Sequence, residues 1–315
     1  MNKLANRLPL SFANKIKEIF PSKWQIIING LCLKKKTSFR VNRLKSSARE
    51  IEERLRALPL KFHKLSYPED AFVLDVDKRD LQDTDLYKEG KIYIQNISSM
   101  LPPLALNLQK GEFILDMCAA PGSKTSQMAG LIGCDGKIIA IEKVKPRFFK
   151  LLANLKQQGA QCVEPVLSDA VAFLRRSQNM LFDKILLDAP CSSEGRFSPH
   201  SPKSFGYWSE KKVKEMQKKQ KRLIKSAIMR LKTGGHLLYS TCTFSPEENE
   251  LVIDWILKQV DGLIVEKISL PITNAISGLT EYKGRALKQQ ISRAVRILPN
   301  EQMEGFFMCL IRKGQ

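Results

Sequence analysis

The chain has 315 residues, is 43% hydrophobic and carries 52 Lys and Arg against 32 Asp and Glu, a formal net charge of +20. This composition excludes a disordered chain and favours a polyanionic partner, because each cation that faces a phosphate releases counterions. Seven cysteines without a C-x-x-C pair, and only three histidines, argue against a disulfide framework and a metal centre. We therefore expect free thiols in a reducing, cytoplasmic compartment, with no metal. We also expect no membrane partner, since no apolar run reaches about 18 residues.

Residues 1–94 predict a small α+β domain, which we expect to bind the polyanionic partner. The basic N-terminus predicts an amphipathic helix, and Ser47 with Glu50 forms a capping box for a helix over 48–58. Around that helix lie β-rich stretches, at 38–41, 60–65 and 72–76. The polar run 75–89 is predicted to be an exit loop, and Pro102-Pro103 to begin the next helix.

Residues 95–315 are predicted to form a second, larger domain, because short apolar runs alternate with amphipathic stretches from Glu112 onward. Such alternation is typical of a parallel sheet covered by helices on both faces. The predicted strands are 113–117, 137–141, 162–166, 184–187 and 237–240, and the predicted helices are 123–131, 146–158 and 170–176. Two further runs, 294–298 and 305–311, predict a C-terminal antiparallel hairpin. The fold class is therefore α/β and Rossmann-like, with a mostly parallel sheet.

The turn after the first of these strands has the composition of a cofactor loop. Ligands of open α/β sheets lie beyond the carboxyl ends of the strands, and small residues let a ligand approach the backbone. Neither a P-loop nor a G-x-G-x-x-G fingerprint is present, which excludes phosphate binding of those kinds. The residues expected to bind the cofactor here are Cys118, Ala119, Ala120, Pro121, Gly122, Ser123 and Lys124.

Carboxylates end the next three strands of the predicted sheet. Glu142 is placed to accept the hydroxyls of a ribose, and Asp169 and Asp188 follow the third and fourth strands. Together they suit a cofactor with a ribose, an amino group and a positive charge, such as S-adenosylmethionine. The alternative for any single one of them is a helix cap.

Two cysteines follow adjacent predicted strands, Cys191 in DAPCSSEG and Cys242 in YSTCTFSPEENE. A thiol in this position can serve as a nucleophile, whereas Cys32, Cys134, Cys162 and Cys309 are expected to be small apolar fillers. A thiolate that adds to carbon 6 of cytosine makes carbon 5 nucleophilic toward a sulfonium methyl, after which a base removes the carbon 5 proton. Asp188 is expected to share a proton with cytosine N3. Strand-end position does not rank the two thiols.

At these residues the chain resembles the Sun-type family of RNA cytosine-5 methyltransferases, also called the Nop/Sun or Fmu family. The resemblance rests on DMCAAPGSKT (116–125) and the two cysteine motifs, with weaker matches FRVNRLK (39–45), IQNISSMLP (94–102) and EGFFMCLIRK (304–313). It implies that Cys242 is the nucleophile, that Cys191 assists product release, and that Arg147 assists at the cofactor. It also implies that the cofactor is S-adenosylmethionine and that the enzyme belongs to class EC 2.1.1.

The resemblance further implies that Arg40 and Asn42 face RNA. The basic stretch 211–225, which begins at Lys211 and Lys212, is either a phosphate-tracking helix or a solvated face. The Gly-, Pro- and Ser-rich segment 193–207 is predicted to be a mobile loop over the active site. We expect a monomer that acts on structured RNA, with tRNA and rRNA both open. Two alternatives are a DNA cytosine-5 methyltransferase that uses Cys191 and a non-catalytic RNA-binding or assembly factor.

Overall fold

The computed structural model of the protein describes residues 4–58, 60–75 and 77–314. The chain divides into two compact units. The first unit comprises the described residues of 1–35, 189–225 and 239–315, and the second comprises 36–188 and 226–238. These units are not bounded at residue 94, and the division into domains 1–94 and 95–315 remains a prediction.

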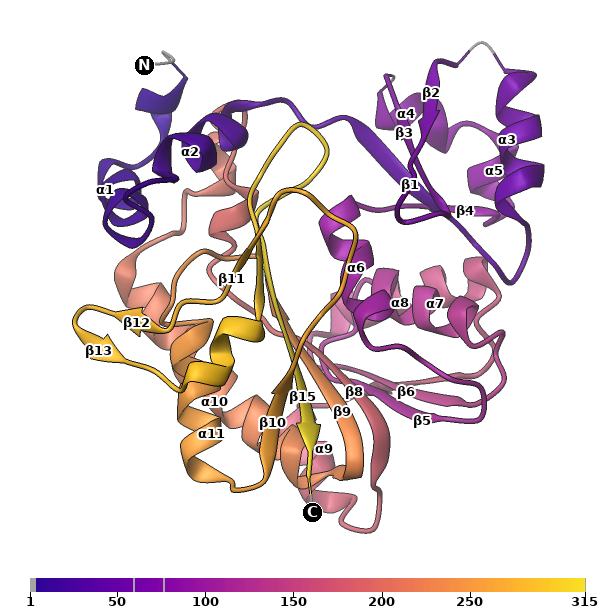
Figure 1. Cartoon of the computed structure of the whole chain (residues 1–315). Coiled ribbons are helices and arrows are strands. Elements are labelled where there is room, and N and C mark those ends of the chain that lie inside the picture. The colour runs from indigo at the N-terminus through magenta and orange to yellow at the C-terminus, as the bar shows by residue number, and fades with distance from the viewer. Residues whose placement is uncertain (1–3, 59, 76, 315) are drawn as a thin grey trace. The chain divides into compact units, whose positions relative to one another are not determined.

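The second unit begins with a four-stranded antiparallel sheet in the order β2-β3-β1-β4 (Figure 1). Its strands are β1 (Thr37–Val41), β2 (Phe62–Lys64), β3 (Ala71–Leu74) and β4 (Ile92–Ile94), and its helices are α3 (Ala48–Arg56), α4 (Lys78–Gln82) and α5 (Asp85–Lys88). The Ser47 side chain accepts a hydrogen bond from the Glu50 N–H at the start of α3, which confirms the predicted cap. The buried core joins α3 to the sheet through Phe39, Ile51, Leu55 and Phe72.

Two details of this region correct the sequence interpretation. The run 75–89 is not simply a loop, because its described residues include α4 and α5, which are capped by Asp77 and Thr84. The next helix, α6 (Ile97–Ala105), begins five residues before Pro102. The Asn96 side chain caps it by accepting from the Ser98 N–H at 3.0 Å, so the cap sets the start of the helix and both prolines lie inside it.

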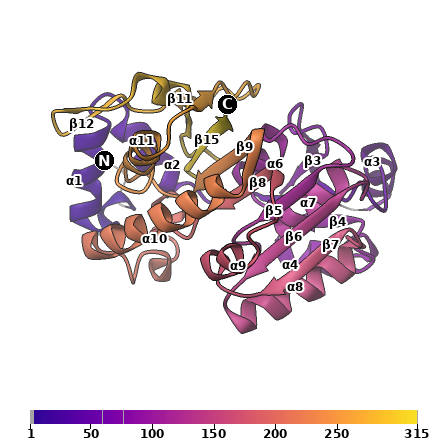
Figure 2. The same cartoon turned by 90° about the horizontal axis from the view of Figure 1, so that it is seen from below.

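The larger sheet of the second unit is parallel, as predicted: β5 pairs with β6 and β8, and β6 pairs with β7. The strands are β5 (Phe113–Asp116), β6 (Lys137–Glu142), β7 (Val163–Leu167) and β8 (Phe182–Asp188), with helices α7 (Ser123–Leu131), α8 (Lys145–Gln158) and α9 (Ala170–Arg176). Figure 2 shows α8 running alongside β6 and β7, which it contacts. Strand β9 (Leu231–Thr241) follows β8 in the sheet order, and its last three residues belong to the first unit.

The first unit contains the described chain ends. Its remaining elements are η1 (Ala5–Arg7), α1 (Leu10–Ile19), α2 (Trp24–Cys32), η2 (Glu194–Arg196), η3 (Pro202–Ser204), α11 (Glu250–Gln259), β10 (Leu263–Glu266), β11 (Ala275–Ser277), β12 (Glu281–Tyr282), β13 (Arg285–Ala286), η4 (Gln289–Arg293), β14 (Val295–Ile297) and β15 (Phe306–Lys313). Helix α10 (Glu210–Met229) lies in it as far as Lys225. The predicted C-terminal hairpin is confirmed, since β14 and β15 pair antiparallel. The α/β fold with a mostly parallel sheet is thus confirmed.

The segment predicted to be a mobile loop is packed into the core of the first unit. Phe197 is 2% exposed, and its ring centroid lies 4.8 Å from that of Phe12 and 6.2 Å from that of Trp208. Aromatic burial of this kind anchors the segment that follows Cys191. Among the described residues, no helix combines the length and apolarity that a membrane span requires.

Candidate active site

The two cysteine segments meet within the first unit. The Sγ atoms of Cys191 and Cys242 lie 3.4 Å apart, and the Ser193 hydroxyl lies 3.5 Å from the Cys242 sulfur. Both cysteines are half-buried. The hydrogen bond with the Cys242 sulfur, and then burial, raises the pKa of Cys191 well above its usual range. The raised pKa favours the protonated form of Cys191 beside the Cys242 sulfur, 3.4 Å away.

Several polar residues that were not predicted from the sequence surround these thiols. Glu194 and Glu248 are fully buried, and both accept hydrogen bonds from the cysteine segments. Ser192 and Gln220 donate to Glu248. Both acids lie in the cysteine motifs, three residues after Cys191 and six after Cys242, but their burial is visible only in the structure.

The candidate cofactor loop, residues 118–122, lies in the second unit between β5 and α7. Gly122 has a φ of 101°, in the left-handed region where a side chain would be strained. Helix α8 supports the loop from outside: Arg147 donates to the Ala120 carbonyl at 2.6 Å, and Asn154 donates to the Pro121 carbonyl at 2.7 Å. Ala119 and Ala120 are buried, while Cys118 and Ser123 are partly exposed. Arg147 thus has a defined structural contact with this loop.

The three carboxylates predicted at the strand ends, Glu142, Asp169 and Asp188, differ in their surroundings. Glu142 is 4% exposed, accepts from the Val144 N–H at 2.8 Å and lies 3.3 Å from Arg147. Asp169 is exposed and caps α9, accepting from the N–H groups of its first turn at 3.0 and 3.2 Å. Lys124 donates to Asp188 at 2.7 Å and to the Ser99 hydroxyl at 2.7 Å. The helix-cap alternative therefore holds for Asp169, and Lys124 and Asp188 form one ion pair.

Arg40 does not face solvent, which corrects its assignment to RNA. Its side chain is 4% exposed and donates to Gln95 at 2.9 Å and to the Ser126 hydroxyl at 2.8 Å. It also donates to the Ser123 carbonyl at 3.1 Å, while burial lowers its pKa to about 10. A guanidinium enclosed in this way cannot reach a phosphate. Its contacts instead hold the first turn of α7, directly after the cofactor loop.

Asn42 is also withdrawn from the RNA-facing set, because it is completely buried. Its amide donates to the carbonyls of Gly90 and Gln158, both at 2.8 Å.

Lys211 and Lys212, by contrast, lie on helix α10 with at least part of each side chain in contact with solvent. Lys211 is exposed on α10, and Lys212 is half-buried and pairs with Glu215 at 3.1 Å, while Val213 turns inward. Helix α10 is therefore amphipathic, with a basic outer face.

Cys134 and Cys162 contradict the expectation of free thiols. The structure joins them as a disulfide with their Cα atoms 5.1 Å apart, and both are half-buried rather than apolar fillers. The loop before β6 and the start of β7 bring them together across 28 residues of sequence. The buried Cys32 and Cys309 do match the expected fillers. In the described part of the chain, no cluster of His, Cys, Asp or Glu is arranged to hold a metal ion.

Comparisons with known proteins agree with this arrangement. Residues 103–312 match the family model described as 16S rRNA methyltransferase RsmB/F. The chain is 38% identical over 284 residues to the tRNA (cytosine(49)-C(5))-methyltransferase of Pyrococcus abyssi, covering 88% of each chain. It is 36% identical over 313 residues to the ribosomal RNA small subunit methyltransferase F of Vibrio cholerae. That match spans 97% of this chain and 64% of the relative.

A solved structure supports the fold. The methyltransferase homolog protein from Pyrococcus horikoshii superposes with a TM-score of 0.85 at 32% sequence identity, covering 99% of both chains. Together with the family model, which matches two thirds of the sequence, this likeness identifies the family that the cysteine motifs indicated. The chain belongs to the RsmB/F family of RNA methyltransferases, the Sun-type family.

Proposed function

We propose that the chain transfers a methyl group from S-adenosylmethionine to carbon 5 of a cytosine in structured RNA. The observation that carries this proposal is the pair of thiols 3.4 Å apart, with the pKa of Cys191 raised well above its usual range. Two relatives, which match 88% and 97% of this chain, are named as RNA methyltransferases, one of them for cytosine C5 of tRNA. Because their names give different RNAs, we propose RNA as the substrate class, with tRNA and rRNA both possible.

Cys242 is assigned as the nucleophile. Its thiolate adds to carbon 6 of the flipped-out cytosine, the carbon 5–carbon 6 double bond opens, and the electron pair makes carbon 5 nucleophilic. Asp188 is assigned to share a proton with N3, which stabilises the charge that develops on the ring. Asp188 and Cys191 are three residues apart, so the chain itself keeps their Cα atoms within about 11 Å. Lys124 holds the Asp188 carboxylate in one orientation.

Cys191 is assigned to product release. Once carbon 5 carries the methyl group, a base removes its proton, the electrons restore the double bond, and the carbon 6–sulfur bond breaks. The sulfur that departs is that of Cys242, which takes back the electron pair. Cys191, whose Sγ lies 3.4 Å from that sulfur, is assigned to donate a hydrogen bond to it as it leaves.

The cofactor is assigned to the second unit, where the donor set fits it. One Glu142 oxygen accepts from a backbone N–H and the other lies 3.3 Å from Arg147, and we assign its remaining acceptor capacity to ribose hydroxyls. The second oxygen of the exposed Asp169 lies 3.9 Å from Lys143, and we assign it to an amino group. The remaining proposed contacts are Cys118, Ala119, Ala120, Pro121, Gly122, Ser123, Lys124 and Asp188, with Arg147 in support. S-adenosylmethionine supplies an electrophilic methyl group on a sulfonium centre.

RNA is assigned to basic surfaces such as the outer face of α10, including Lys211 and Lys212. Affinity should fall steeply with salt, because the phosphate contacts release counterions. Replacing Lys211 by Gln should lower the slope of log affinity against log salt by about 1, and an unchanged slope would remove this residue from the interface. We further propose that the enzyme acts as a monomer in the cytoplasm, where structured RNA is available.

Separate replacement of the two cysteines tests the assignment. Cys191→Ala should accumulate a covalent protein–RNA adduct that survives denaturing electrophoresis, whereas Cys242→Ala should form none and lose methyl transfer. The reverse pattern, with the adduct lost in Cys191→Ala and retained in Cys242→Ala, would support the route through Cys191 that a DNA cytosine-5 methyltransferase uses. Bisulfite sequencing of host RNA with and without the protein identifies the methylated position, and the absence of any such position would favour a non-catalytic factor.

A further inference from the structure

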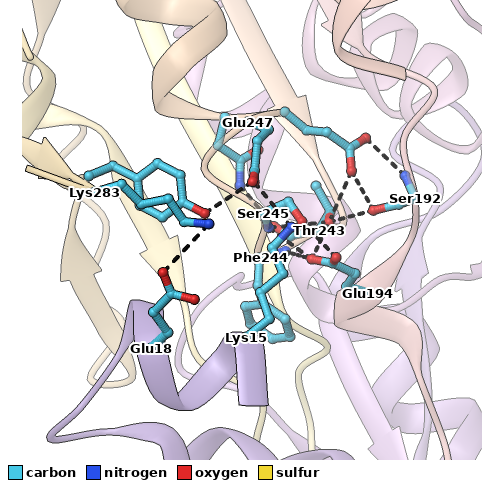
Figure 3. Close-up of polar contacts among 12 residues, drawn as sticks. Lys15, Glu18, Ser192, Glu194, Thr243, Phe244, Ser245, Glu247 and Lys283 are labelled. Carbon is cyan, nitrogen blue, oxygen red and sulfur yellow. Dashed lines mark hydrogen bonds and ion pairs between the residues drawn. The ribbon is translucent and has the colours of Figure 1, made fainter. Parts of the chain in front are cut away.

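Glu194 ties the segment that follows Cys191 to the segment that follows Cys242. It stands three residues after Cys191, and Figure 3 shows its carboxylate surrounded by the backbone and hydroxyl donors of the other segment. The donors are the Thr243 hydroxyl at 2.7 Å, the Ser245 N–H at 2.8 Å, the Ser245 hydroxyl at 2.6 Å and the Phe244 N–H at 3.1 Å. The Trp208 indole donates a further bond at 2.9 Å.

Glu248 makes the same connection in the opposite direction. It stands six residues after Cys242 and accepts from the N–H of Ser192 at 3.0 Å and from the Ser192 hydroxyl. Gln220, on the inner face of α10, donates to Glu248 at 2.9 Å and to the Pro190 carbonyl at 3.0 Å. The residues on both sides of Cys191 are therefore held through one buried carboxyl and one amide. We call Glu194 and Glu248 with these donors the carboxylate clasp.

The charge of Glu248 disfavours the thiolate form of Cys191. Its negative charge is one of the influences that raise the pKa of Cys191, after the hydrogen bond with Cys242 and burial. Burial raises the pKa of Glu248 itself to about 7, so this charge is present above neutrality and absent at acidic pH. The titratable groups that face Glu248 are Cys191 and Glu194 after β8 and Tyr239 on β9, and α10 contributes the neutral Gln220.

The neighbouring Glu247 provides a matched control within the same run of acids. Its carboxylate points to the other side of the chain, where it accepts from the Tyr282 hydroxyl at 3.0 Å and lies 3.1 Å from the Lys15 ammonium (Figure 3). Among the described residues, its carboxylate contacts Tyr282 and Lys15 rather than the donors of the clasp. Replacing Glu247 thus removes an acid of the same kind, one position away, without changing the clasp.

We propose that Glu248 is a positioning residue of the active site, which holds the Cys191 segment through Ser192 and, by its charge beside Cys191, makes Cys242 the thiol that loses its proton. This inference deepens the proposed function and rests on it for the meaning of the thiols. It supplies a physical reason for the ranking of Cys242 over Cys191, which strand-end position alone did not give.

The test measures thiol reactivity in the full chain without RNA or cofactor. The protein is alkylated with iodoacetamide between pH 6 and 8.5, and mass spectrometry of tryptic peptides follows Cys191 and Cys242 separately. We expect Cys242 to react faster than Cys191. Glu248→Gln should reduce the ratio of the two rates by about threefold to tenfold, since one unit of pKa changes the thiolate fraction tenfold. Glu248→Asp should restore most of the ratio, and Glu247→Gln should leave it unchanged.

A folded Glu248→Gln protein whose rate ratio equals that of the wild type would overturn the inference, as would an equal loss in Glu247→Gln. If Glu248→Gln does not fold, the wild-type protein still decides. The ratio of the Cys242 to the Cys191 rate should rise as the pH passes through about 7, where Glu248 gains its charge, and a constant ratio would contradict the proposal. Because no methyl transfer is needed, failure of this test is distinguishable from failure of the proposed reaction.

Discussion

The thiol segments and the strand ends of the second unit both place acids at the carboxyl ends of strands, but they use them differently. Glu194 and Glu248, beside the thiols, are 0% exposed and accept several hydrogen bonds from the protein itself. Asp169 is exposed, and the Asp188 side chain is 30% exposed. An acid whose acceptor sites are filled by the protein fixes geometry, whereas an acid with open sites can bind a ligand. Glu142, a candidate ligand-binding acid, is itself 4% exposed, so filled acceptor sites, rather than burial alone, distinguish the positioning acids.

The first prediction tests whether burial acts alike in both regions. Burial raises the pKa of Asp116, at the end of β5, from its ordinary value of 3.8 to about 7. The folded protein thus keeps a proton that the unfolded chain loses, so stability falls as the pH rises from about 4 to 7 and is then constant. We expect this effect to lower the free energy of unfolding of the wild type by up to roughly 4 kcal/mol between these pH values. Asp116→Asn, which cannot titrate at this position, should not show this decrease.

Urea unfolding at several pH values, compared between wild type and Asp116→Asn, provides the measurement. Glu248→Gln should show the same sign over about pH 4.5 to 7, because burial also raises the pKa of Glu248 to about 7. If the difference in the free energy of unfolding between the wild type and a variant does not depend on pH, the replaced carboxyl has an ordinary pKa in the folded protein. Burial would then not act alike in the two regions.

Glu194→Gln should cost about 3 kcal/mol of stability, because the bonds to a charged carboxylate are lost. The new amide nitrogen would also face one of the N–H donors, since the Trp208 indole and two backbone N–H groups all point at this carboxylate. Thermal unfolding followed by circular dichroism measures the effect. Glu247→Gln, which leaves these donors in place, is the control. A loss below about 1 kcal/mol in Glu194→Gln would show that its bonds are dispensable.

Lys124→Met should lower kcat/KM for methyl transfer by about thirtyfold, equivalent to about 2 kcal/mol, because Asp188 loses a charged partner at 2.7 Å. Steady-state transfer of a labelled methyl group measures it. Lys137 pairs with Glu164 at 2.8 Å with both side chains 55% exposed, so Lys137→Met controls for the loss of a cation. Equal activity in both variants would mean that Lys124 has no role in the reaction.

The smallest expected effect separates the two tasks of Asp169. Asp169→Ala should cost about 1 kcal/mol of stability, because α9 loses its cap. Asp169→Asn keeps a capping oxygen and should remain within a few tenths of a kcal/mol of the wild type. If Asp169 also binds the cofactor, both variants weaken the binding of S-adenosylmethionine in calorimetry. Unchanged binding in both would leave the cap as its only task.

The sequence by itself determined the parallel α/β region and the positions of the two cysteines. Apolar runs of strand length and caps such as Ser47 are local signals, so the predicted strands at 113–117 and 137–141 were confirmed as β5 and β6 to within a residue. The candidate cofactor loop was predicted from local signals too, because its small residues and Gly122 suit the conformation of the turn itself.

Only the tertiary structure decided which polar side chains are enclosed. Arg40 and Asn42 have the composition of an RNA-facing motif, yet Gln95, Ser126 and Gln158, far along the chain, bury them in hydrogen bonds. The pairing of Cys134 with Cys162 and the clasp of Glu194 and Glu248 also join distant segments. Local sequence cannot encode such partners, because burial and hydrogen-bond satisfaction depend on what packs against a side chain in three dimensions.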